Sequence, residues 1–171
     1  RGSKATGEIL FSLVSSRALE GEGLGELVQL GEALLDRVDG ACGVVAIENM
    51  DKGNVLLKGE SRTLVGRSSV TEEICGFKHE IGPQSFFQIN PVSAAAMFET
   101  ALGYAGDGDL CLELFCGVGA MTLPLTRAFK KVIAVELSEE SVSALKRSLS
   151  QVPAEVVRVE QGDAYKLGPQ L

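Results

Sequence analysis

The chain has 171 residues, of which 45% are hydrophobic and 23% charged, so it can bury one good core or two small ones and is not a disordered protein. Its formal net charge of −7 argues against a nucleic-acid-binding surface that works alone. No apolar stretch approaches the roughly 20 residues of a membrane span.

The four cysteines form no CxxC pair and lack a histidine at ligand spacing, which predicts reduced thiols, no metal site and a cytoplasmic protein. The chain begins without a methionine, which indicates a segment of a longer protein.

The first half of the chain has the pattern of a small α+β domain, predicted to span residues 1–84. Residues 7–14 are predicted to be a strand, and apolar side chains at helical spacing predict a helix over 24–38. Further strands are predicted at 43–48, 54–58, 69–74 and 77–81. His79, the single histidine, is expected to be a solvated residue of the last strand.

A second region, predicted to span residues 85–171, alternates helices and strands. Asn90 is a favoured N-cap and Pro91 suits the first helical position, so a helix should begin there and stop at 106–108. Strands are expected at 109–115, 131–137 and 155–160, and helices at 119–129 and at 139–150, the latter capped by Ser138. This alternation is typical of a parallel sheet covered by helices. Only three strands fit, so we expect a truncated sheet with an unpaired edge and an uncovered face, through which two copies associate or which is mobile.

A glycine-rich turn follows the first of these three strands. Gly117 and Gly119 let the backbone approach a ligand closely, and Glu136 ends the next strand 19 residues after Gly117. This spacing suits dinucleotide enzymes and S-adenosylmethionine enzymes alike, but the third glycine of GxGxxG is missing. Glu113 before the turn and Gly162-Asp163 after the third strand favour adenosine without a pyrophosphate. A methyltransferase pocket is therefore preferred to a nicotinamide or flavin site and to a purely structural turn.

Two segments together resemble one known family. The residues Ser85-Phe86-Phe87-Gln88-Ile89-Asn90, followed at this distance by Phe115-Cys116-Gly117-Val118-Gly119, are similar to those of the RNA uracil-5-methyltransferases, which form 5-methyluridine in transfer and ribosomal RNA. Residues 53–56, 65–66 and 81–85 also resemble the central domain of that family. The resemblance implies an α/β fold in which a truncated Rossmann-like S-adenosylmethionine-dependent methyltransferase sheet is preceded by a small α+β domain.

The resemblance also implies roles for particular residues. Gln88 would lie over the active site, in contact with the cofactor or a flipped uracil, and Glu136 would hold the ribose hydroxyls. Phe86 or Phe87 could stack on an extruded base, with core packing as an equal alternative for both. The other residues implied for the S-adenosyl-L-methionine pocket are Phe115 and Ala120 along its amino-acid and ribose portion, Gly117 and Gly119 for backbone approach, and Asp163 at the adenine end.

The family's chemistry uses a cysteine thiolate that adds to carbon 6 of uracil, so that carbon 5 displaces the methyl group from the sulfonium of the cofactor. A base then removes the proton of carbon 5, and the cysteine leaves carbon 6. In the family both groups lie downstream of the third strand, and none of the four cysteines here has a matching context. The resemblance therefore implies a parent enzyme that acts on transfer or ribosomal RNA, and no catalytic residue in this chain. The alternatives are a non-catalytic adenosine-cofactor-binding or assembly module of the same fold and, with less support, a methyltransferase for a protein or a small molecule.

Overall fold

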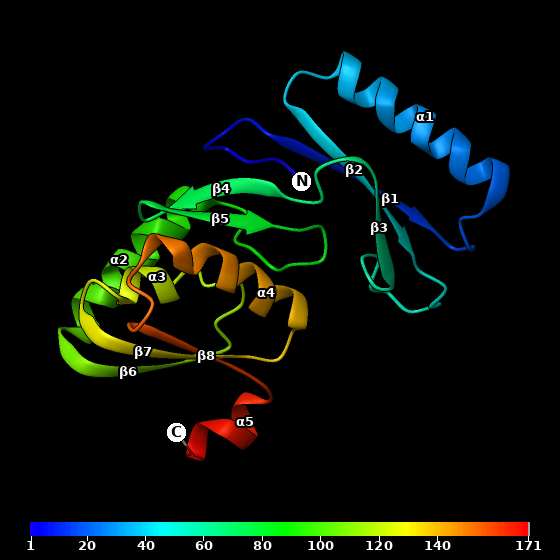
Figure 1. Ribbon diagram of the computed structural model, residues 1–171. Coiled ribbons are helices and arrows are strands. Elements are labelled where there is room, and N and C mark those ends of the chain that lie inside the picture. Colours follow the sequence, from blue (N-terminus) through cyan, green and yellow to red (C-terminus); the bar gives the residue numbers. More distant parts are fainter. Residues whose placement is uncertain (171) are drawn as a thin grey trace. The chain divides into compact units, whose positions relative to one another are not determined.

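The computed structural model describes residues 1–170, which form two compact units (Figure 1). The first unit comprises Arg1–Thr71 and Gly82–Gln84, and the second comprises Glu72–Ile81 and residues 85–170. None of the helices in the described part of the chain is long and apolar enough to cross a membrane. All four cysteines are free thiols, as the sequence predicts.

The first unit is a three-stranded sheet covered by one helix. Its elements are β1 (Ile9–Ser15), α1 (Gly21–Arg37), β2 (Ala41–Glu48) and β3 (Glu60–Gly66), and the strand order is β1-β2-β3. β1 pairs parallel with β2, and β2 pairs antiparallel with β3. The helix packs on β2 and β3, where Gly31 permits the close approach because a Cβ at this position would lie 2.8 Å from Cγ2 of Val65. The central strand carries the core of this unit.

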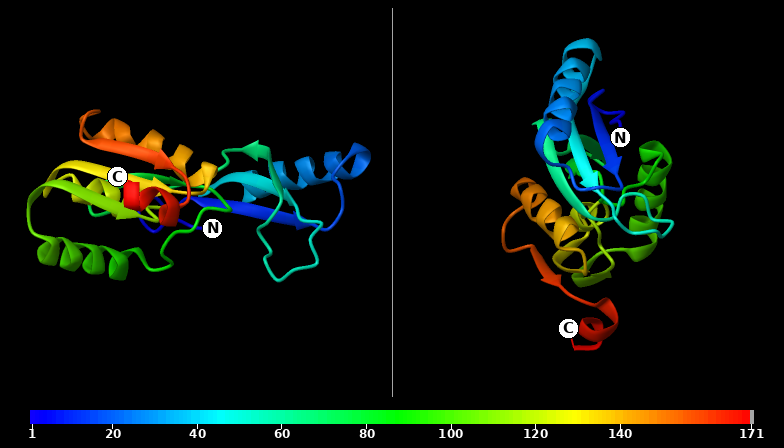
Figure 2. Two further views of the ribbon diagram at one scale, coloured as in Figure 1. Left: turned by 90° about the horizontal axis from the view of Figure 1, so that it is seen from below. Right: turned by 90° about the vertical axis from the view of Figure 1, so that its right-hand side faces the viewer.

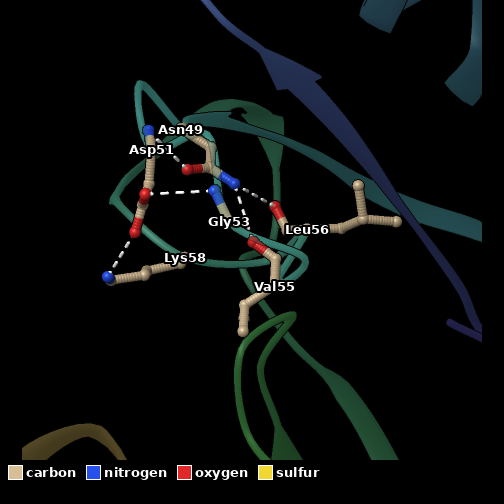
Figure 3. Close-up of polar contacts among 6 residues, drawn as sticks. All are labelled: Asn49, Asp51, Gly53, Val55, Leu56 and Lys58. Carbon is tan, nitrogen blue, oxygen red and sulfur yellow. Dashed lines mark hydrogen bonds and ion pairs between the residues drawn. The ribbon is translucent and has the colours of Figure 1, made fainter.

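The strand predicted over 54–58 is absent, and the segment is a loop between β2 and β3 (Figure 3). The buried amide of Asn49 donates from Nδ2 to the carbonyl oxygens of Val55 (2.8 Å) and Leu56 (3.0 Å). Its Oδ1 accepts the N–H of Asp51 (3.1 Å), and Asp51 in turn accepts the N–H of Gly53 (3.1 Å). These side-chain bonds satisfy backbone groups that a strand pairing would otherwise use, so the segment forms a loop although it is predicted to be a strand.

The second unit opens with a hairpin of β4 (Val70–Ile74) and β5 (Phe77–Ile81), whose second strand packs on helix α4 (Glu139–Ser148). The hairpin is tied to this part of the chain by several bonds. Gln151 accepts the N–H of Lys78 (2.8 Å) and donates to its carbonyl oxygen (2.7 Å), and Arg147 pairs with Glu80 at 2.6 Å. The position of β5 is thus defined by side chains more than 60 residues away in the sequence.

The remaining elements of the second unit form the predicted parallel sheet. They are α2 (Pro91–Ala105), β6 (Gly108–Leu114), α3 (Thr122–Leu125), β7 (Phe129–Glu136), α4, a 3-10 turn η1 (Leu149–Gln151), β8 (Val157–Gln161), α5 (Ala164–Leu167) and a second 3-10 turn η2 (Gly168–Gln170). The strand order is β6-β7-β8, and both pairings are parallel. The helix predicted over 119–129 is reduced to the single turn α3, because the glycine turn occupies its expected beginning.

The predicted helix caps are confirmed. Oδ1 of Asn90 accepts the N–H of Ser93 at 3.2 Å with Pro91 in the first turn, and Oγ of Ser138 accepts the N–H of Ser141 at 3.3 Å. Glu139 and Glu140 follow Ser138 in the first turn of α4, where a negative charge favours the helix dipole.

The two faces of the β6-β7-β8 sheet differ. Helices α2, α3 and α4 lie on one side of it, and within residues 1–170 only the short α5 lies toward the other (Figures 1 and 2). On the covered side, Leu125 and Val132 pack with Val157 in a core cluster that Leu102 of α2 also joins. On the other side, the alternating side chains of β6 remain exposed: Leu110 (55%), Leu112 (40%) and Leu114 (41%). The sheet therefore has an apolar stripe, defined by these three leucines, that the described residues leave uncovered.

Candidate cofactor-binding site

The glycine turn has the backbone geometry that its sequence requires. Gly117 and Gly119 have φ angles of +57° and +85°, in the left-handed region where glycine is favoured. Phe115 is also in this region, at +61°, which is a strained conformation for an aromatic residue and is typical of functional sites. An added Cβ at Gly117 would meet nothing within 4 Å, so space for a ligand lies beside this backbone. Gly119 instead faces the interior, where a Cβ would lie 2.3 Å from Cδ1 of Leu145.

The carboxylate of Glu136 ties the glycine turn to the end of β7. Its Oε2 accepts the N–H of Gly117 (2.9 Å), and its Oε1 accepts the N–H groups of Leu137 and Ser138 (both 2.8 Å). A carboxylate has about four lone-pair positions, so these three bonds leave little acceptor capacity for ribose hydroxyls in the present geometry. The resemblance predicts that Glu136 binds the ribose hydroxyls. In the structure, the carboxylate of Glu136 instead binds backbone N–H groups and so holds the glycine turn in place.

A second carboxylate, that of Glu113, is buried at the carboxyl end of β6. Thr122 at the start of α3 donates from Oγ1 to its Oε2 at 2.5 Å. Burial raises the pKa of Glu113 to about 7, an effect that the hydrogen bond from Thr122 only partly offsets. The group is thus close to half-ionised at neutral pH, and a nearby positive charge would favour its ionised form.

Cys116 is the buried residue of the turn and is not suited to be a nucleophile. Burial raises the pKa of its thiol to about 12, with Glu113 and Glu136 contributing in the same direction. Its side chain packs with Ala134 and Leu145 in a core cluster. Since the thiolate is the reactive form, this cysteine is inert at physiological pH.

A cavity of about 260 Å³ brings the two motifs of the sequence together. This volume is slightly below the roughly 300 Å³ at which small-molecule pockets commonly begin. Its walls come from three parts of the second unit: the segment after β5, helix α2 and the glycine turn. They are Phe86, Phe87 and Gln88; Phe98; and Glu113, Phe115, Cys116, Gly117, Val118, Ala120 and Met121.

Four of the predicted site residues line this cavity: Gln88, Phe115, Gly117 and Ala120. The other three lie elsewhere. Gly119 belongs to the glycine turn but faces Leu145 in the interior, and Glu136 accepts the N–H of Gly117. Asp163 is the N-cap of α5, where its Oδ1 accepts the N–H of Tyr165 at 2.9 Å. Sequence reasoning missed Phe98, Val118 and Met121 as wall residues, because apolar side chains in a helix or turn give no signal that separates a pocket from a core.

The two adjacent phenylalanines have different environments. Phe86 is 77% exposed, whereas Phe87 is only 9% exposed, which favours the packing interpretation for Phe87. Phe115 is itself 62% exposed, and its ring meets Tyr165 edge-on with centroids 5.6 Å apart. The walls of the cavity therefore include the exposed aromatic rings of Phe86 and Phe115.

His79 does not lie where the sequence predicts. The expectation of a solvated residue is wrong, because the side chain is 0% exposed and its ring centroid is 6.1 Å from that of Phe87. The surrounding residues come from the segment 85–90 and the glycine turn, which the strand pattern alone could not reveal. Desolvation lowers the pKa of His79 to about 4, so the imidazole is neutral at physiological pH. Within residues 1–170 no group of three or more histidine, cysteine or acidic side chains could hold a metal ion.

The fold and the turn together define a class: the second unit has the Rossmann-like architecture of methyltransferases. The fold of the chain is similar to that of the tRNA (uracil-54, C5)-methyltransferase of Pyrococcus abyssi, solved with S-adenosyl-L-homocysteine, with a TM-score of 0.73 and 20% identity over 95% of this chain and 38% of that one. It is less similar to the tRNA m1G37 methyltransferase of M. jannaschii, with a TM-score of 0.54 and 15% identity over 91% of this chain and 45% of that one.

The sequence comparisons identify the family. The profile of the tRNA (uracil-5-)-methyltransferases matches residues 3–161, so the chain belongs to this family. An uncharacterised RNA methyltransferase of Clostridium tetani is 30% identical over 97% of this chain and 36% of its own length. Another, from Thermosynechococcus vestitus, is 35% identical over 83% of this chain and 31% of its own length. The chain thus spans about a third of the length of the curated relatives it matches.

Proposed function

We propose that the chain is part of an S-adenosyl-L-methionine-dependent RNA (uracil-5-)-methyltransferase that forms 5-methyluridine in transfer or ribosomal RNA. The observation that carries the proposal is the 260 Å³ cavity, in which the segment with Gln88 meets the glycine turn. Family membership over residues 3–161 supports the reaction class, and the relative from Pyrococcus abyssi is named for uracil-54 of tRNA and was solved with the demethylated cofactor.

The residues present fit such a cofactor. The open space beside Gly117 admits close approach to the backbone, and the buried carboxyl group of Glu113 suits a ligand that carries positive charge. When bound, the cofactor supplies the methyl group. The chain's own part is to bind and orient it: Gly117 offers backbone, Phe115 and Ala120 offer apolar walls, and Glu136 fixes the turn. Gln88 lies on the cavity wall beside Phe86, where we place the uracil.

We propose that the nucleophilic cysteine and the base belong to the part of the parent protein that this chain does not include. Burial raises the pKa of Cys116, Cys111 and Cys75, and of the three only Cys116 touches the cavity. We also retain residues 1–84 as a central domain and 85–171 as the first half of the methyltransferase domain. The cytoplasmic location stays a prediction from the sequence.

Self-association is a further part of the proposal. The apolar stripe of Leu110, Leu112 and Leu114 is exposed on one sheet face. Parallel sheets are normally covered on both faces, so a second copy of the chain is proposed to cover this one.

Two experiments test the proposal. Calorimetric titration of the chain with S-adenosylhomocysteine should give saturable binding, and Glu136→Ala should abolish it. Transfer of a labelled methyl group to tRNA and rRNA transcripts should occur with the full-length parent and not with this chain. Digestion of the labelled RNA to nucleosides should give 5-methyluridine as the labelled product. Methylation of another atom or of protein would contradict the proposed reaction.

A further inference from the structure

The imidazole of His79 is a buried polar group without a hydrogen bond. It is 0% exposed, and within residues 1–170 neither Nδ1 nor Nε2 has a partner. Buried polar side chains are nearly always satisfied, because an unpaired donor or acceptor loses its bonds to water and gains none. A histidine that only filled space here would therefore stabilise the fold less than a leucine, so the presence of a polar side chain requires an explanation.

The position of His79 is determined by the strand that carries it. β5 packs on α4 and is tied to it and to the following turn through Glu80–Arg147 (2.6 Å) and through Gln151, whose amide bonds both backbone groups of Lys78. Since Lys78 and Glu80 flank His79 directly, these bonds fix the position of the His79 backbone. The imidazole is thus held in the interior of the second unit by its neighbours.

The ring lies behind two walls of the candidate cofactor cavity. On one side is Phe87, tilted at 43° with centroids 6.1 Å apart. The ring also lies near the backbone of Val118 in the glycine turn, which favours the protonated imidazole although the geometry falls short of a hydrogen bond. Both Phe87 and Val118 line the cavity. A small movement of the turn would therefore decide whether the imidazole N–H is satisfied.

We propose that His79 is a positioning residue for this cavity: when the cofactor binds, the neutral imidazole donates a hydrogen bond to the backbone carbonyl of Val118 and holds the glycine turn and the ring of Phe87 against the ligand. The inference rests on the proposed function, since it names how the same site is organised. Neither ring nitrogen has a partner among residues 1–170, so the proposed hydrogen bond to Val118 would satisfy a donor that is otherwise unpaired. His79 contacts no reacting atom in this mechanism and acts through Val118.

The single histidine of the chain makes a direct test feasible. A long-range ¹H–¹⁵N correlation spectrum of uniformly labelled chain contains one set of imidazole signals, which need no assignment. Addition of S-adenosylhomocysteine should shift the protonated ring nitrogen and its proton and slow the exchange of that proton with water. Ring signals that stay unchanged at saturating ligand would overturn the proposal.

Variants separate positioning from packing. His79→Leu removes the unpaired polar group, so its melting temperature should be unchanged or higher, while its affinity for S-adenosylhomocysteine should fall by about fivefold, the worth of one hydrogen bond. His79→Gln retains a donor and should recover most of the affinity. Ile81→Val, buried on the same strand, is the control and should lower the melting temperature without changing affinity. Equal affinity of His79→Leu and the unaltered chain would contradict the proposal.

The amide signals of Val118 and Gly119 give a second measurement. On addition of S-adenosylhomocysteine they should shift in the unaltered chain and in His79→Gln, and less in His79→Leu at equal saturation, because the proposed hydrogen bond forms on binding. Binding with equal shifts in all three proteins would overturn the inference and leave the proposed function standing. Absence of binding by the unaltered chain would contradict the proposed function and this inference with it.

Discussion

Gly117 and Glu136 are joined by a hydrogen bond of 2.9 Å, from the N–H at the centre of the glycine turn to the carboxylate at the end of the neighbouring strand. The same carboxylate accepts the next two N–H groups of its own chain, those of Leu137 and Ser138. One side chain thus aligns two loops at the carboxyl ends of adjacent parallel strands, which is where α/β proteins bind their ligands. A single substitution should reveal whether this alignment supports binding, stability or both.

Glu136→Ala removes the acceptor of three backbone N–H groups, and we expect a loss of unfolding free energy of about 1–3 kcal/mol together with loss of cofactor binding. Glu136→Gln keeps one oxygen, which can still accept from Leu137 and Ser138, and should restore most of the stability but not the binding. Chemical denaturation and calorimetric titration measure the two effects. Full binding by Glu136→Ala would show that this alignment of the two loops is not required for cofactor binding.

Gly117 and Gly119 provide a matched pair within one turn. Gly119→Ala places a Cβ 2.3 Å from Cδ1 of Leu145 at a φ of +85°, so it should destabilise the fold by at least about 2 kcal/mol. Gly117→Ala meets no atom and should cost only the strain of a positive φ, about 1 kcal/mol. Because the ligand is proposed to occupy the space beside Gly117, this milder substitution should nevertheless weaken S-adenosylhomocysteine binding more than tenfold in titration calorimetry. Unchanged affinity would place the ligand away from this backbone.

Glu113 should make stability depend on pH with a defined sign. Its pKa is raised from 4.5 to about 7, so between these values the folded chain binds more protons than the unfolded one. Stability due to this group therefore falls as pH rises through that range, by about 2 kcal/mol between pH 5.5 and 8. Denaturant unfolding of the unaltered chain and of Glu113→Gln at both pH values isolates the effect, since the glutamine does not titrate. Parallel pH dependence in the two proteins would contradict the raised pKa.

Cys116 should resist alkylation. With a pKa of about 12 and 7% exposure, its thiol presents almost no thiolate at pH 8, so iodoacetamide should leave it unmodified in the folded chain and modify it after unfolding. Peptide mapping by mass spectrometry gives the modified fraction at each cysteine. Cys116→Ala should retain cofactor binding, because the residue is proposed to pack and not to react. Rapid alkylation of the folded chain at Cys116 would reopen the question of a nucleophile in the turn.

The apolar stripe on β6 should govern the association state. Leu112→Lys introduces a charge at its centre, and we expect it to convert a dimer of the chain into a monomer. Light scattering coupled to size exclusion, at several concentrations, measures the mass. Val92→Lys is the control, because Val92 of α2 is 72% exposed and lies outside the stripe. A monomeric unaltered chain would contradict the proposed self-association.

Local chemistry explains what could be predicted for this chain. Helix entry at Asn90 and Ser138 needs only a capping side chain and the residues next to it, so it was visible in the sequence and is confirmed. The order of strands and helices after residue 90 follows from alternation of apolar segments with turns, and it also holds. The glycine turn was recognised for the same reason, since a positive φ restricts the residue type at the position itself.

The features that only the tertiary structure decided all depend on distant partners. The segment 54–58 is a loop because Asn49 binds its carbonyl groups, although its own pattern predicts a strand. The carboxylate of Glu136 accepts N–H groups of the glycine turn and of its own loop. His79 is buried because α4, Phe87 and Val118 surround it. Periodicity reports which side of an element is apolar, but burial and pKa depend on what packs against that side. The sequence by itself determined the family and the position of the glycine turn, because both depend on residue types at fixed positions. The tertiary structure decided which polar groups at the turn keep unused hydrogen-bonding capacity, because that depends on partners from distant segments.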